Sequence, residues 1–113
     1  MSEDKNYIPK KGDIVWLDFD LSTGNEIQKR RAGVVVSRYE FNRKTMVAVI
    51  CPITSTVKKL PTRYSLPEDL DTKGQVLIYQ LESLDFKERK LKKIENLPLK
   101  DMAKIDQIIQ YIF

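Results

Sequence analysis

The chain alternates short apolar runs with polar, turn-forming segments. Runs rich in β-branched and aromatic residues occupy residues 13–19, 32–37, 46–53 and 74–80, and weaker runs occupy residues 62–66 and 91–94. Runs of this length, bounded by Gly, Pro, Asn, Asp and Ser, are typical of strands rather than helices. The pattern therefore predicts a small, mostly β fold, with residues 39–44 as a loop.

The last part of the chain has a different spacing. Apolar side chains recur there every three or four residues, at Met102, Ile105, Ile109 and Ile112. This spacing predicts an amphipathic helix. Pro98 suits its first turn, because the missing N–H costs nothing there, and Asp101 suits the helix dipole. We therefore expect one domain, residues 1–113: a small Src-homology-3-like antiparallel barrel with a C-terminal helix.

Two residue types limit the chemistry of the chain. It contains no histidine, which excludes Ser-His-Asp and Cys-His arrangements and nearly every zinc site. Cys51 is the only cysteine, and its place in an apolar run favours a buried core residue over a nucleophile. The net charge of +4 permits a phosphate-rich partner without requiring one. With no secretory signal and no membrane-length apolar run, a cytoplasmic protein is expected.

Six short motifs follow one another along the chain. They are KGDIVWLDFD (residues 11–20), GNE (24–26), RAGVVVS (31–37), PITS (52–55), GQVL (74–77) and Gln80 followed by SLD (83–85). In these motifs and their order, the chain resembles the MazF/PemK (Kid) toxin family from about Pro9 to Ile112. It departs from the family pattern at Leu21, Asn25, Ala32 and Tyr79, where proline, serine, proline and aspartate are usual.

The resemblance implies a sequence-specific endoribonuclease, an mRNA interferase that cuts single-stranded RNA without a metal or other cofactor. The ribose 2′-OH would attack the adjacent phosphorus and leave a 2′,3′-cyclic phosphate and a 5′-OH. By family position, Arg31 and Thr54 are the expected catalytic residues. An arginine fork can hold two phosphoryl oxygens where charge accumulates. The residues expected to bind RNA are Glu26, Gln28, Lys29, Arg30, Ser55, Thr56, Lys58, Lys59 and Gln80. The family also implies a homodimer and a cognate antitoxin with an acidic, disordered tail.

Without the resemblance, the same residues have simpler interpretations. An arginine at a strand start is typical of a surface ion pair, and a threonine there is typical of a strand-end hydroxyl. Trp16 alternates with Ile14 on one strand face, which favours a core residue over a base-stacking platform. Two other functions stay open: a non-catalytic RNA- or protein-binding module of the same fold, and a CcdB-like poison of DNA gyrase.

Overall fold

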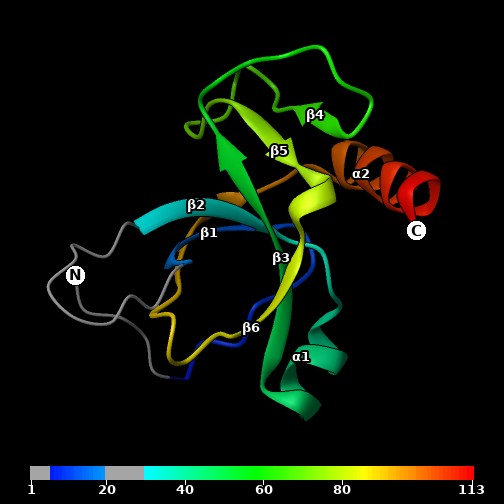
Figure 1. Ribbon diagram of the computed structural model, residues 1–113. Helices are drawn as coiled ribbons and strands as arrows, with labels where there is room; N and C mark the ends of the chain where they lie inside the picture. The colour runs from blue at the N-terminus through cyan, green and yellow to red at the C-terminus, as the bar shows by residue number, and fades with distance from the viewer. Residues whose placement is uncertain (1–5, 20–29) are drawn as a thin grey trace, which may run out of the picture.

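The computed structural model describes residues 6–19 and 30–113 as strands, two helices and one 3-10 turn (Figure 1). In chain order these are β1 Asp13–Asp18, β2 Arg30–Val35, α1 Tyr39–Thr45, β3 Val47–Thr54, β4 Arg63–Ser65, β5 Gln75–Leu77, η1 Ile78–Gln80, β6 Glu82–Asp85, β7 Lys92–Asn96 and α2 Leu99–Ile112. Among these residues, no helix is both long and apolar enough to cross a membrane.

All the strand pairs are antiparallel, in the order β4-β5-β3-β2-β1-β7. The long strand β3 pairs with β2 along one side and with both β5 and β6 along the other. The predicted antiparallel sheet with a C-terminal helix is therefore confirmed. The described strands form an open sheet rather than a closed barrel, because no pairing among them joins β7 to β4 or β6.

Each face of the sheet carries its own apolar core. On one face, the α2 residues Met102 and Ile105 pack with Ile14, Val34, Cys51 and Val76. The other core contains Val15, Leu17, Val35, Ile50, Leu84, Phe86 and Leu91. Asp101 anchors α2 to β4, since its carboxylate accepts a hydrogen bond from the Tyr64 hydroxyl. Burial of apolar area on both faces is the main force that stabilises such a sheet.

Cys51 is fully buried, as its sequence context predicts. Burial raises the pKa of its thiol to about 12. The buried thiol therefore stays protonated at neutral pH, which agrees with a packing residue of the core.

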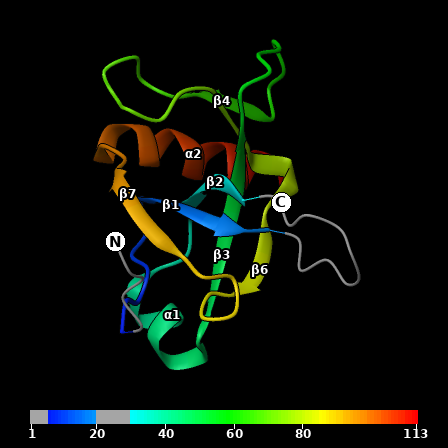
Figure 2. The same ribbon diagram turned by 90° about the vertical axis from the view of Figure 1, so that its left-hand side faces the viewer.

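The segment predicted as a loop at residues 39–44 is instead the helix α1, which lies away from α2 at a different end of the sheet (Figure 2). No side chain caps its N-terminus. Contacts with residues outside the helix hold it: Asn42 is buried, donates to the carbonyl of the distant Pro9 (2.9 Å) and accepts from the Ser37 hydroxyl (2.5 Å). The prediction was wrong because these partners give no local helical signal.

Candidate active site

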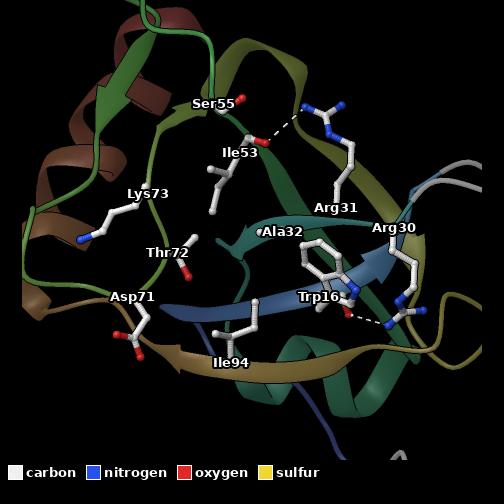
Figure 3. Close-up of a pocket in the computed structure, with 10 residues that line it drawn as sticks. All are labelled: Trp16, Arg30, Arg31, Ala32, Ile53, Ser55, Asp71, Thr72, Lys73 and Ile94. Atoms are coloured by element: carbon white, nitrogen blue, oxygen red, sulfur yellow. Dashed lines mark hydrogen bonds between the residues drawn. The ribbon is translucent and has the colours of Figure 1, made fainter.

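A pocket of about 470 Å³ opens on the sheet face that α2 covers only in part (Figure 3). Its lining consists of Trp16, Arg30, Arg31, Ala32, Ile53, Ser55, Asp71, Thr72, Lys73 and Ile94. The ends of β1 and β3, the start of β2, the middle of β7 and the segment before β5 contribute these residues. The pocket is therefore assembled from five separate parts of the chain.

Trp16 lines the pocket instead of filling the core. Ile14 packs against α2 residues, whereas Trp16 is 40% exposed. The alternation along β1 correctly suggests that both side chains belong to one face. The core interpretation of Trp16 is nevertheless wrong, because α2 does not extend over that end of the face. The exposed indole is left available to a ligand.

Arg31 lies at the rim of this pocket, near the start of β2. Its Nη2 donates a hydrogen bond to the Ile53 carbonyl (3.3 Å), and its guanidinium lies 5.9 Å from the centroid of the Phe19 ring. Among the described residues, the guanidinium has no other hydrogen-bond acceptor. The remaining N–H groups can therefore bind an anionic ligand, for which a planar guanidinium is well suited.

Thr54 is the last residue of β3 and directly follows the carbonyl that Arg31 binds. The two residues predicted as catalytic thus come from neighbouring strands to one end of the sheet. The Thr54 Oγ1 accepts a hydrogen bond from the Thr56 N–H (3.2 Å). Because that bond uses only a lone pair, the hydroxyl can still donate its own hydrogen to a ligand.

Arg30 also lines the pocket, but both of its terminal nitrogens already have protein acceptors. Nη1 pairs with the buried Asp18 carboxylate at 3.0 Å, and Nη2 donates to the carbonyls of Lys90 (2.8 Å) and Trp16 (3.3 Å). This arginine therefore fixes the strand ends on which Trp16 and Arg31 stand. Its predicted contact with RNA would require it to exchange these partners.

The other predicted RNA-binding residues lie in different places. Ser55 lines the pocket, and Thr56, Lys58 and Lys59 follow it on an exposed loop. Gln80 is not among the pocket residues and donates to the Tyr79 hydroxyl (2.9 Å). Glu26, Gln28 and Lys29 lie outside the described residues. The structure thus groups Arg30, Arg31 and Ser55, and the RNA contacts of all these residues stay predictions.

The pocket wall at Asp71, Thr72 and Lys73 was not predicted from the sequence. Glu95 of β7 holds this wall. Its carboxylate accepts hydrogen bonds from the backbone N–H groups of Asp71 (3.2 Å) and Thr72 (2.7 Å) and from the Thr72 hydroxyl (2.6 Å). A polar connecting segment carries no signal for such a role. Only the packing of β7 beside it reveals the wall.

The Glu95 carboxylate should make the stability of the protein pH-dependent. Burial acts to raise the pKa of Glu95, but hydrogen bonds from Thr72 and Asp71 and the charge of Lys73 lower it below its ordinary value of 4.5. A lowered folded-state pKa gives stability that is present above pH 4.5 and is lost as the pH falls through the folded-state pKa. Glu95→Gln should therefore differ from the wild type most near neutral pH. Denaturant unfolding from about pH 7 to about pH 3 measures this, and a difference that stays constant with pH would contradict it.

Two curated relatives resemble the chain in sequence. Endoribonuclease toxin MazF of Escherichia coli (strain K12) is 32% identical over 83 residues, which are 74% of this chain and 74% of that protein. Endoribonuclease EndoA of Bacillus subtilis (strain 168) is 30% identical over 112 residues, covering 91% of this chain and 92% of that protein.

Solved structures resemble it as well. The crystal structure of MazF (Form-I) from Deinococcus radiodurans matches with a TM-score of 0.84 at 31% identity, covering 95% of this chain and 97% of that one. The crystal structure of MazE-MazF (Form-II) from the same organism matches with a TM-score of 0.88 at 31% identity, covering 95% and 96%. The family model of the PemK-like, MazF-like toxin of type II toxin-antitoxin systems matches residues 10–113. The chain therefore belongs to the PemK/MazF toxin family, as its motifs predict.

Proposed function

We propose that this toxin is a sequence-specific endoribonuclease that cuts messenger RNA at the end of the sheet where Arg31 and Thr54 lie, next to the pocket that Trp16 lines. Its relatives MazF and EndoA are endoribonucleases. One observation supports this position of the active site. The Arg31 guanidinium lies at the pocket rim near Thr54, and among the described residues it donates a hydrogen bond to only one protein acceptor, the Ile53 carbonyl. A cation fixed in this way is available for a phosphate.

The reaction uses a nucleophile that RNA itself supplies. The 2′-oxygen forms a bond to phosphorus as its proton passes to solvent water, and the bond from phosphorus to the 5′-oxygen breaks as that oxygen takes a proton from solvent. Arg31 holds the non-bridging oxygens while charge builds on them, and Thr54 donates a further hydrogen bond. Arg31 is not the base, because a guanidinium essentially never loses its proton in proteins. DNA, which lacks the 2′-OH, is not cut.

The pocket also suits an unpaired base. The half-exposed Trp16 indole lies beside Ala32, Ile53 and Ile94, which give the pocket an apolar side. An aromatic ring of this kind stacks readily on a base of single-stranded RNA. Lys58 and Lys59, exposed on the loop after Thr54, attract the neighbouring phosphates.

A toxin of this family has a cognate antitoxin as its partner, and MazE-MazF complexes are known for relatives. We propose that an acidic, disordered tail of that antitoxin folds over the basic rim of the pocket and excludes RNA. The toxin itself acts as a homodimer. The α2 side chains Leu99 and Tyr111 and the terminal Phe113 are strongly exposed, which supports an interface at this helix.

The proposed function is tested by incubating the purified toxin with a long unstructured RNA in EDTA. Discrete cuts that carry 5′-OH ends are expected, and DNA of the same sequence should stay intact. RNA that is bound but never cut would instead support the non-catalytic binding module. If the RNA is neither bound nor cut, trapped gyrase–DNA complexes would support the gyrase poison.

Trp16 offers a direct test of where RNA binds. It is the only tryptophan of the chain, so intrinsic fluorescence reports on this pocket alone. A non-cleavable RNA with a 2′-deoxy nucleotide at the cut position should quench this emission as it binds. Saturating binding without a change in emission would place the RNA away from the pocket.

A further inference from the structure

The exposed loop that follows Thr54 leads from β3 to β4 (Figure 1), and side chains of β4 and β5 bind its backbone. This loop carries the predicted RNA-binding residues Ser55, Thr56, Lys58 and Lys59, all of which are exposed. An exposed loop of this length without strand pairing loses considerable conformational entropy when it is fixed for binding. What holds the loop in the free protein therefore affects how tightly it binds a ligand.

Gln75 is the centre of this support. Its side chain is only 5% exposed, and its Oε1 accepts a hydrogen bond from the Lys58 backbone N–H (3.0 Å). The same oxygen accepts from Nη1 of Arg63 (3.2 Å), and Nε2 donates to the Ser65 hydroxyl (3.0 Å). One buried amide thus joins the loop backbone to β4.

Arg63 extends the network to a second point of the loop. Its Nη1 also donates to the Thr56 carbonyl at 2.7 Å. The loop backbone is therefore held at Thr56 and at Lys58 by two side chains that share one hydrogen bond. The Arg63 Nε is buried and has no hydrogen-bond partner. The hydrogen bonds that Arg63 makes to the loop and to Gln75 therefore come from Nη1.

We propose that Gln75 is a positioning residue for RNA binding, which keeps the loop from Ser55 to Lys59 in its binding conformation before RNA arrives. This inference rests on the proposed function. Gln75 itself is too buried to touch RNA and acts through the Lys58 backbone. Arg31 and the Thr54 backbone are held instead by strand pairing, in which Thr54 lies opposite Gln75, and this backbone pairing does not use the Gln75 side chain. The effect should therefore fall on binding and spare the chemical step.

Gln75→Leu tests the proposal, because it removes the acceptor and the donor at similar volume. KM and the Kd for non-cleavable RNA, read from Trp16 fluorescence, should each rise about tenfold, while kcat stays within about threefold. Hydrogen exchange of the Lys58 amide should accelerate, whereas amides of β1 and β2 should keep their protection. This exchange measurement needs no RNA, so it remains informative if the toxin cuts nothing.

Two variants serve as matched controls. Gln75→Glu keeps two acceptor oxygens for the Lys58 N–H and for Arg63, so it should restore most of the RNA affinity. Ser65→Ala removes only the partner of Nε2 and should leave KM unchanged. The proposal is overturned if Gln75→Leu binds RNA like the wild type, if kcat falls as much as affinity does, or if Gln75→Glu binds no better than Gln75→Leu. Absence of cleavage by the wild type would refute the proposed function and leave the Kd and exchange tests valid.

Discussion

Arg31→Ala is expected to lower kcat for RNA cleavage by about 10²- to 10³-fold, the usual cost of losing a donor to a transition-state oxyanion. The free guanidinium N–H groups at the pocket rim are the reason, since they would meet the phosphoryl oxygens as charge develops. Single-turnover cleavage of an RNA that contains the recognition sequence measures the effect. KM should change much less than kcat, because this interaction strengthens in the transition state.

The folded state should tolerate this change. Within the described residues, Arg31 makes one hydrogen bond and one ring contact, so its removal should cost about 1 kcal/mol of unfolding free energy. Arg31→Lys keeps the charge and loses the planar fork, and its kcat should fall between the wild type and the alanine variant. Full activity of a folded Arg31→Ala protein would show that another group stabilises the phosphorane.

The neighbouring arginine provides a matched comparison. Arg30→Ala leaves the buried Asp18 carboxylate without its cation and frees the Lys90 carbonyl. We expect it to cost about 2 kcal/mol of unfolding free energy, more than Arg31→Ala does. Its loss of kcat should be smaller, since both of its terminal nitrogens already have protein acceptors. Of the two adjacent arginines, Arg30 should thus matter more for the unfolding free energy and Arg31 more for kcat.

Most strands and the terminal helix were predictable because their signals are local, although the strand predicted over residues 74–80 ends at Leu77, where η1 begins. Strand runs and helical spacing are set by neighbouring residues, and the observed β1, β3 and α2 follow them closely. The strand β6 and the helix α1 were missed for the opposite reason. Leu84 is the only buried residue of β6, and α1 is held by the distant Pro9 carbonyl. Short elements that depend on tertiary partners leave little trace in the sequence.

The candidate site was predictable only where family motifs cover it. Arg31, Thr54 and Ser55 lie in such motifs, and the structure places them at one end of the sheet. The wall from Asp71 to Lys73 is defined by its contact with Glu95, 23 residues away from Thr72 in the chain. The exposure of Trp16 depends on how far α2 extends over the sheet. These are properties of topology, which one sequence read locally does not contain.

Gly74→Ala should be among the most destabilising single changes in the described part of the chain. Gly74 has a φ of +123°, which side chains rarely adopt, and a Cβ placed there would lie 2.2 Å from the Thr54 carbonyl oxygen. Strain and clash together should cost about 3 kcal/mol or more, which lowers Tm by about 10 °C or more in a domain of this size. Thermal and denaturant unfolding measure both quantities. Because the clash is with the Thr54 backbone, cleavage by the remaining folded protein should fall as well.

Gly12→Ala separates the clash from the backbone strain. Gly12 also has a positive φ, +93°, but a Cβ there would meet only the Leu97 carbonyl oxygen at an ordinary 3.7 Å. Its substitution should therefore cost about 1 to 2 kcal/mol, the strain alone, and leave RNA cleavage unchanged. The excess loss in Gly74→Ala then measures how tightly β5 is packed against Thr54. Equal losses in the two variants would mean that the Thr54 carbonyl moves aside at little cost when a Cβ is added at Gly74.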